Sequence, residues 1–265
     1  RSCLIISLLL LGIAVWNFAA PAILSTQASG ERKIPIYSVE TGKPQVALSF
    51  DAAWGNDDTQ TLLDILASHN VKATFFMTGG WVESYPDDVK AIAAAGHDLG
   101  NHSENHKQMS ALSAGDCETE LMTVHNKVKD ITGLEMTLFR PPYGDYNNQL
   151  VEVANGLGYH VIQWNVDSLD WKYYGADDIV SRVLNHKNLG NGSIILMHNG
   201  AKYTKDALDR IITGLQEKGY EIIPISQLIY TENYTTDHTG RQQPVSAPKS
   251  VTIQPYISDL RSYRC

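Results

Sequence analysis

Short apolar runs alternate with amphipathic segments along most of this chain, and this alternation limits the possible folds more than any other feature. The amphipathic segments carry apolar residues at helical spacing, as in residues 59–69 and 204–218. The apolar runs, which we expect to be buried strands, are 46–50, 73–77, 98–101, 138–140, 160–165, 193–197 and 221–224. Strands joined by helices form parallel βαβ units, and about seven of them predict an α/β fold with a closed or nearly closed (β/α) barrel.

Length and composition set broad limits on function. With 265 residues, 43% of them hydrophobic, the chain can bury one core of catalytic size. The formal net charge of −8 and the lack of a basic cluster argue against a nucleic-acid partner. Cys3, Cys117 and Cys265 are too few and too scattered for a disulfide framework, so we expect unpaired thiols.

The two ends of the chain differ from the alternating region. Residues 3–24 form an apolar run behind Arg1, long enough at about 1.5 Å per residue to cross a bilayer core of about 30 Å. We interpret residues 1–28 as a cleaved secretory signal or an uncleaved membrane anchor, and we favour the anchor because the run exceeds an ordinary signal core. Both interpretations predict export, so that the rest of the chain acts outside the cytoplasm.

The remaining residues divide into three parts. Residues 29–45 are expected to be a polar linker and an extended lead-in, and residues 46–230 form the predicted domain. Residues 231–265 are rich in Thr, Ser, Gln and Pro with little periodicity, which predicts a low-complexity, disordered tail.

His102 and His106 are the clearest chemical motif. At a spacing of four residues, the two imidazoles fall on one side of a helical turn, where they can converge on one cation. Such pairs also occur by chance on exposed helices. This pair directly follows the predicted strand at 98–101, and α/β folds place their chemistry at the carboxyl ends of strands. The position therefore favours a metal site.

Most of the other predicted strands also end at a polar or aromatic residue that could do chemistry. These residues are Asp51, Arg140, Tyr143, Asp167, Asp170, Trp171 and His198. Any one of them is more often part of a structural ion pair or a solvated loop. Because the carboxyl ends of barrel strands meet at one face, the whole set indicates a shared site.

The residue types in this set suit hydrolysis. Asp51 could take a proton from a metal-bound water, and Arg140 could keep that carboxylate ionised and oriented. His198 could protonate a leaving amine, with Asp170 orienting its imidazole. A backbone N–H in the turn at Tyr143 could bind an oxyanion. This machinery cleaves an amide or ester without a covalent intermediate.

Four tryptophans are candidates for the wall of a sugar-binding groove, with core packing as the even alternative for each. They are Trp54, Trp81, Trp164 and Trp171.

Five motifs in order resemble those of a known family. They are Ser49-Phe50-Asp51, His102-Ser103-Glu104-Asn105-His106, Arg140-Pro141-Pro142-Tyr143-Gly144, Asp167-Ser168-Leu169-Asp170-Trp171 and Leu196-Met197-His198. Over residues 34–230 the chain resembles the polysaccharide deacetylases of carbohydrate esterase family four, also called the NodB homology domain. Within that family it looks like the PdaB-like, sporulation-associated branch of spore-forming Gram-positive bacteria.

The resemblance implies a fold, an activity and a set of roles. It implies a distorted (β/α) barrel that removes acetyl groups from N-acetylglucosamine or N-acetylmuramic acid in peptidoglycan or chitin, using zinc or another divalent ion such as cobalt. By the same resemblance, the catalytic residues are Asp51 as base, His198 as acid, Arg140 as tether of the base and Asp170 as partner of the acid; the metal ligands are His102 and His106; and the substrate-binding residues are Tyr143, Trp171 and Leu196.

One position departs from the family pattern. The family has two adjacent aspartates in its first motif, the second being the third metal ligand, and here that position is Ala52. Asp57 or Asp58 could reach in from the same loop, Asp51 could bind the ion itself, or the site could hold metal weakly. We favour Asp57 as the replacement; its alternative role, with Asp58, is to cap the helix that begins near Thr59.

Three functions follow from these observations. The first is a metal-dependent deacetylase of cell-wall amino sugars, consistent with the paired base and acid. The second is a catalytically impaired wall-binding or sporulation structural protein on the same scaffold, because Ala52 replaces a ligand. The third is hydrolysis of another amide such as a cyclic ureide, which the expected export argues against.

Overall fold

The computed structural model describes residues 31–245. The predicted signal or anchor at 1–28 and the last twenty positions of the chain, 246–265, lie outside the described residues. Within 31–245, no helix is both long enough and apolar enough to span a membrane. Cys117 is the one cysteine in this range, and it is buried and unpaired.

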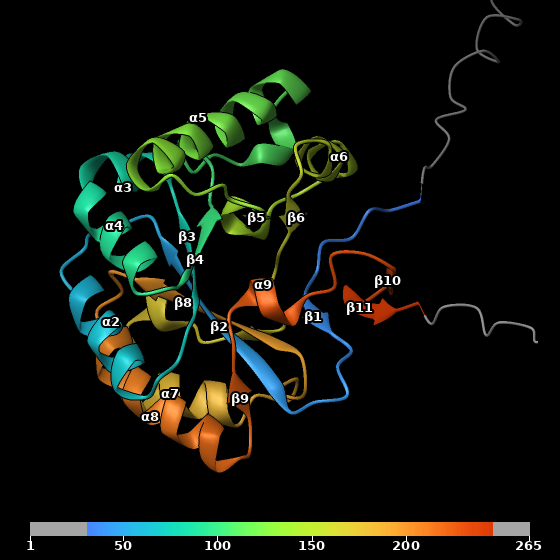
Figure 1. Ribbon diagram of the computed structural model, residues 1–265. Coiled ribbons are helices and arrows are strands. Elements are labelled where there is room, and N and C mark those ends of the chain that lie inside the picture. Colours follow the sequence, from blue (N-terminus) through green and yellow to red (C-terminus); the bar gives the residue numbers. More distant parts are fainter. Residues whose placement is uncertain (1–30, 246–265) are drawn as a thin grey trace, which may run out of the picture. The chain divides into compact units, whose positions relative to one another are not determined.

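The described chain folds as a curled, mostly parallel sheet with helices packed on its outer side (Figure 1). Five strands lie side by side in parallel in chain order: β2 (Gln45–Ala52), β3 (Thr74–Met77), β4 (Asp98–Asn101), β5 (Leu138–Phe139) and β6 (His160–Val161). On the other side of β2 lies β8 (Ser193–Asn199), which also pairs in parallel with β7 (Val166–Asp167). The short β9 (Glu221–Ile222) pairs with the start of β2.

The lead-in segment brings the two ends of this row of strands toward each other. Ile36 forms an isolated parallel bridge with Ile162, directly after β6. Two residues later β1 (Ser38–Val39) pairs with β8. The α/β fold with a curled parallel sheet is therefore confirmed, and each of the predicted strands is present, as β2 to β6, β8 and β9.

The helices begin and end where local chemistry places them. They are α2 (Thr59–Ser68), α3 (Gly79–Ser84), α4 (Pro86–Ala94), α5 (Ala114–Thr132), α6 (Asn148–Gly156), α7 (Ala176–Leu184), α8 (Thr204–Glu217) and α9 (Ile225–Leu228). The Ser113 side chain caps α5 by accepting the N–H of Asp116, and Gly133, with φ 74°, ends it. Two short helices, α3 and α9, were not predicted, because segments of six and four residues are too short to show helical periodicity.

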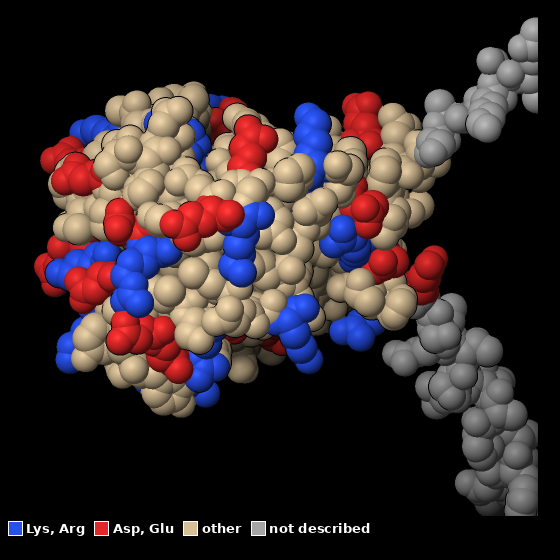
Figure 2. All heavy atoms as spheres, turned by 90° about the horizontal axis from the view of Figure 1, so that it is seen from below, with Lys and Arg blue, Asp and Glu red and all other residues tan. Residues whose placement is uncertain are grey.

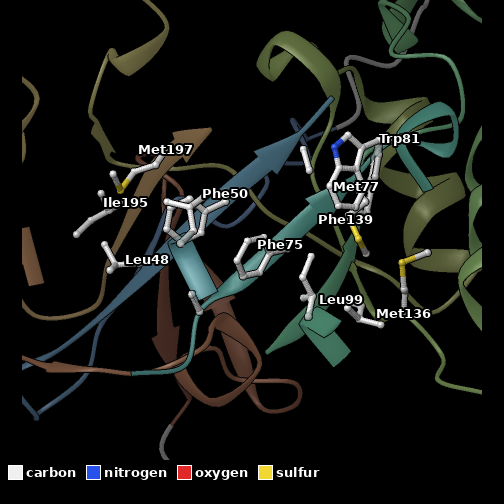
Figure 3. Packing of buried hydrophobic residues seen from close by; sticks show 14 of the residues in the cluster. Leu48, Phe50, Phe75, Met77, Trp81, Leu99, Met136, Phe139, Ile195 and Met197 are labelled. Atoms are coloured by element: carbon white, nitrogen blue, oxygen red, sulfur yellow. The ribbon is translucent and has the colours of Figure 1, made fainter. Parts of the chain in front are cut away.

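Apolar side chains from neighbouring strands fix the alignment of the sheet. Phe50 of β2 stacks on Phe75 of β3 with ring centroids 5.0 Å apart, and Ile195 and Met197 of β8 lie beside Phe50 (Figure 3). Trp81 is only 2% exposed and belongs to this cluster, so it is a core residue and not part of a sugar groove. Shifting β2 by one residue would exchange its two buried faces and move Phe50 away from Phe75 and Met197, which makes the pairing of β2 with its neighbours specific.

The prediction of a disordered tail from residue 231 is wrong for residues 234–244. Strands β10 (Tyr234–Thr236) and β11 (Arg241–Pro244) form an antiparallel hairpin, and β11 pairs in parallel with β1. The hairpin is held by polar contacts: the fully buried Gln242 side chain bonds to both the N–H and the C=O of Tyr230. Polar strands of this kind lack the alternating pattern from which strands are predicted. With β1, they also extend the sheet beyond the predicted domain at 46–230.

Charges of both signs are interspersed on the face seen in Figure 2. Lysine and arginine side chains lie beside aspartate and glutamate side chains, and no continuous basic area is visible on the described part of that face. This distribution gives a nucleic-acid backbone no extended site of attachment there.

Candidate functional site

The strand alignment brings the ends of several strands to one cavity of about 430 Å³. Residue 51 of β2 lies directly opposite residue 198 of β8, so Asp51 and His198 enter the same end of the sheet. The cavity is lined by Asp51, Ala53, Trp54, His102, His106, Tyr143, Trp164, Asp167, Trp171, Leu196 and His198. Seven of the nine predicted site residues are in this set, and the other two, Arg140 and Asp170, are fully buried and bonded to Asp51 and His198.

Arg140, which is fully buried behind the cavity, fixes the orientation of the Asp51 carboxylate. Its Nη1 donates to Oδ1 of Asp51 at 2.6 Å, and its Nη2 donates to the Ser49 hydroxyl at 2.8 Å. The guanidinium also lies over the ring of Phe76, 4.2 Å from its centroid. Burial raises the pKa of Asp51, but the charge and hydrogen bond of Arg140, together with the charge of His198, outweigh burial and lower that pKa below its ordinary value. Asp51 is therefore an ionised carboxylate. Its Oδ1 is bonded to Arg140, and its Oδ2 faces His102.

The predicted helical turn at His102 and His106 is wrong, although the two rings do meet. Residues 102–106 form a loop in which Ser103 and His106 have left-handed φ values of 66° and 53°. The imidazole centroids lie 4.9 Å apart. The rings converge because the loop folds back on itself, and not because of helical spacing.

His102 is held in one tautomer. Its Nδ1 donates to the backbone oxygen of Arg140 at 2.7 Å, which leaves Nε2 as the free lone pair, 3.5 Å from Oδ2 of Asp51. Burial lowers the pKa of His102 to about 4 and also lowers the pKa of His106. Two neutral imidazoles, one of them oriented by a carbonyl, are what a divalent transition metal requires of histidine ligands.

A third ligand is missing from the expected position. The Ala52 methyl is fully buried in the apolar core cluster, and methyl cannot ligate. Asp57 is exposed and does not line the cavity, so it does not take the place that we predicted for it. Asp58 is buried, but its Oδ1 accepts the N–H of Gly200 and the side-chain amide of Asn199.

The donors therefore fit a cation only in part. Within residues 31–245 no three His, Cys, Asp or Glu side chains are grouped to hold a metal ion. The two imidazoles suit zinc or a similar ion, and Oδ2 of Asp51, at 3.5 Å from a ligating nitrogen, is the carboxylate oxygen beside them. A metal held by two histidines alone should bind more weakly than one with a dedicated carboxylate.

Asp170 orients the His198 imidazole and favours its protonated form. Its Oδ1 accepts from Nδ1 of His198 at 2.7 Å, while its Oδ2 accepts from the His198 backbone N–H at 2.7 Å and from the Thr204 hydroxyl at 2.6 Å. Burial lowers the pKa of His198, but the hydrogen bond and charge of Asp170 outweigh burial and raise that pKa above its ordinary value. With Nδ1 occupied, Nε2 is the nitrogen left to exchange a proton in the cavity.

The turn after Arg140 presents an unused donor. Tyr143 has a left-handed backbone (φ 61°, ψ 6°), and the N–H groups of Gly144 and Asp145 close the turn onto Pro141 and Pro142. The N–H of Tyr143 donates to none of the residues described in the structure. Tyr143 is 65% exposed as a residue, and its ring packs on His106 with centroids 4.5 Å apart.

The sequence analysis gave no role to two residues that contribute to the site. Ser49, which bonds Arg140, lies two residues before Asp51 on the same face of β2, so strand periodicity could have identified it. Thr204, which bonds Asp170, starts α8 and carries no local signal.

A comparison with known proteins places this arrangement in a family. The family model described as polysaccharide deacetylase matches residues 38–162. The chain is 38% identical to the peptidoglycan-N-acetylglucosamine deacetylase PgdA of Listeria monocytogenes and 34% identical to the peptidoglycan-N-acetylglucosamine deacetylase of Bacillus cereus, each over 74% of this chain and over 41% and 72% of those proteins. The chain belongs to the polysaccharide deacetylase family.

The relatives of this chain differ in length and in activity. The chain is 35% identical to the uncharacterized protein YlxY of Bacillus subtilis and spans only 60% of its length, as it spans less than half of PgdA. A CE4 family pseudoenzyme from Bacillus anthracis has the same fold, with a TM-score of 0.71 and 35% identity over 74% of this chain and 69% of its own. A mutant of that pseudoenzyme is described as having restored enzymatic activity. The family thus contains both active and inactive members, and Ala52 makes the distinction relevant here.

Proposed function

We propose that this polysaccharide deacetylase removes N-acetyl groups from the amino sugars of cell-wall polysaccharide, with peptidoglycan as the first substrate class and a chitin-like glycan as the second. The observation that carries the proposal is the meeting, in one cavity, of a carboxylate whose pKa is lowered and an imidazole whose pKa is raised. Such a separation of pKa values supports Asp51 as the base and His198 as the acid. The relatives named as peptidoglycan deacetylases support the substrate class.

The proton steps follow from the contacts of each group. Asp51 accepts a proton from the attacking water at Oδ2, since Oδ1 is held by Arg140. The hydroxyl adds to the acetyl carbon, and the carbonyl oxygen becomes an anion to which the free N–H of Tyr143 can donate. His198 then donates its Nε2 proton to the sugar nitrogen as the C–N bond breaks. The products are acetate and a free amine.

His102 and His106 would hold the divalent ion, for which zinc is the first candidate and cobalt the second. When bound, such an ion polarises water and the acetyl carbonyl and so lowers the barrier to attack. Family enzymes generally depend on such a metal. Neutral imidazoles and the carbonyl bond of His102 support this assignment.

Aromatic side chains around the cavity suit a sugar substrate. Trp54, Trp164 and Trp171 line it, and Leu196, two residues before His198 on β8, also lines it. We assign Trp171 and Leu196 to the acetyl pocket and the other two rings to the faces of the sugars, which stack on aromatic groups. Because the substrate is a wall polymer, we place the domain outside the cytoplasm, exported and attached to the membrane by the N-terminal segment.

A second candidate function is binding of wall glycan without turnover. The presence of Ala52 where the family has its third metal ligand favours binding without turnover, and the similarity to a family pseudoenzyme is compatible with that function. The base, the acid and their partners are all present and bonded as catalysis requires, so we rank hydrolysis first.

Metal depletion and replacement separates the two candidates. The chain would be stripped with a chelator and then given Zn²⁺, Co²⁺, Mn²⁺, Ni²⁺ or Mg²⁺ in turn, with acetate release from purified peptidoglycan and from N-acetylchitooligosaccharides as the readout. Deacetylation predicts release that depends on one or more of these ions. Glycan binding in pull-down with no release under any of them would establish the second function.

A further inference from the structure

The loop that carries His102 and His106 adopts a backbone that needs support. Ser103 and His106 both have φ values in the left-handed region, which residues with side chains rarely adopt. Neither is glycine, and the loop contains no proline to fix its shape. Inside the loop, the Ser103 hydroxyl accepts the N–H of His106 at 3.0 Å. The rest of the support for this backbone comes from contacts made from outside the loop.

The N–H groups of Gly79 and Gly80 in α3 donate to the backbone oxygens of Ser103 and Glu104. Helix α5 supplies most of the side-chain contacts, although it carries none of the cavity residues. It passes over the carboxyl end of β4, from which the loop leaves (Figure 1). The side-chain amide of Asn101 donates to the backbone oxygen of Leu121 in α5 at 2.9 Å, and its Oδ1 accepts the N–H of Ser103 at 2.9 Å. Lys127 of α5 forms an ion pair with Glu104 in the middle of the loop.

Glu120 makes the most complete of these attachments. It is 4% exposed, and both of its carboxylate oxygens bond Asn105: Oε2 accepts the backbone N–H at 2.8 Å, and Oε1 accepts the side-chain amide at 2.9 Å. Lys107 lies 2.9 Å from Oε1 and balances the charge. Burial raises the pKa of Glu120, but the bonds from Asn105 and Lys107 outweigh burial and lower that pKa, so the group is ionised.

The geometry of this contact matters because of its place in the loop. Asn105 directly precedes His106 and is three residues after His102. The two bonds from Glu120 fix both the peptide plane and the side chain of Asn105, and they use no imidazole nitrogen. They constrain the path of the backbone between the two rings and leave both rings free to ligate.

We propose that Glu120 is a positioning residue that holds the His102–His106 loop in its ligating conformation and thereby sets the affinity of the site for a divalent cation. The proposal rests on the metal-binding part of the proposed function and not on the identity of the substrate. Outer partners that orient a ligand typically change metal affinity by about 10-fold to 100-fold when they are removed.

The test compares two substitutions on one helix. Glu120→Gln keeps the shape and removes the charge and one acceptor, whereas Glu118→Gln removes the same charge from an exposed position two residues earlier. Each full-length variant would be titrated with Co²⁺, following the visible absorption of the bound ion. We expect the affinity of Glu120→Gln to fall by about 10-fold or more, with altered band shape, and Glu118→Gln to match the wild type.

Two further measurements keep the outcome decisive. Circular dichroism and urea unfolding would show whether Glu120→Gln is folded. If it is not, Asn105→Ala replaces it, because this substitution removes the side-chain amide bond to Glu120 from the loop side. Wild-type Co²⁺ affinity and spectrum in both variants would overturn the proposal. A wild type that binds no Co²⁺ would contradict both the proposal and the metal site, whereas one that binds Co²⁺ but releases no acetate would contradict the deacetylase function alone.

Discussion

Replacing Asp170 by asparagine should change the pH dependence of the enzyme more than its fold. The substitution keeps the size of a fully buried side chain and removes one negative charge, whose oxygen lies 2.7 Å from Nδ1 of His198. Two unit charges whose centres lie about 4 Å apart interact by about 4 kcal/mol at an effective dielectric constant of about 20. Since about 1.4 kcal/mol corresponds to one pKa unit, the substitution lowers the pKa of His198 by up to about 3.

The sign of the effect follows from the role of His198 as acid. Activity requires the protonated imidazole, so the alkaline limb of the profile of kcat against pH reports its pKa. In the wild type that pKa is raised, which places the limb above the ordinary histidine value of 6.5. In Asp170→Asn the limb should move toward acid by about 2 to 3 pH units, with kcat near neutral pH falling in proportion.

The assay is acetate release from an N-acetylchitooligosaccharide between pH 5 and 10 with the metal held constant. Asp177→Asn, which alters an exposed carboxylate at the start of α7, is the matched control and should leave the profile unchanged. Urea unfolding should show a loss of about 1 to 3 kcal/mol for Asp170→Asn, because the amide cannot accept all the bonds of the carboxylate. An alkaline limb in the same place as in the wild type would refute the assignment of His198 as the acid charged by Asp170.

Three further substitutions test other parts of the account. Arg140→Gln leaves the buried Asp51 charge without its partner and should lower the free energy of unfolding by about 3 to 5 kcal/mol in urea; a loss below about 1 kcal/mol would show that the pair is not structural. Burial lowers the pKa of His97 to about 4 from 6.5, so its neutral form, which accepts the N–H of Ala73, contributes stability that is complete above pH 6.5 and is lost as the pH falls to 4. Between pH 6.5 and pH 4 the free energy of unfolding should fall by roughly 3 kcal/mol in the wild type because of His97. In His97→Gln this part of the fall should be absent, and the same pH dependence as in the wild type would contradict the assignment. Ala52→Asp restores the ligand type of the family and should raise Zn²⁺ affinity about 100-fold, measured by competition with a chelator; an unchanged affinity would show that residue 52 cannot reach the histidines.

Much of the site could be predicted because parallel strands align their ends. Asp51 and His198 each follow a buried apolar run, and the strand pairing places them directly opposite each other. Sequence alone identified them because burial of both faces of a parallel strand leaves a clear apolar run that stops where the polar residue begins. The same rule located Arg140 and Asp170, which turned out to lie behind the cavity and not in its wall.

The parts that could not be predicted depend on contacts between distant residues. The spacing of His102 and His106 suggested a helical turn, but Ser103 and His106 take left-handed conformations that are supported by Glu120, which lies on another element. The hairpin at 234–244 gives no apolar pattern, because β11 is ordered by pairing with β1, about 200 residues away. Local propensity carries no information on either contact.

The central claim is that Asp51 and His198 act as base and acid on an acetyl group in one cavity. Its most direct test is acetate release from peptidoglycan by the metal-loaded chain and by the variants Asp51→Asn and His198→Ala, with folding checked by circular dichroism. The account predicts release by the wild type and a loss of about 100-fold or more in each variant at unchanged fold. Full activity in either variant would contradict it.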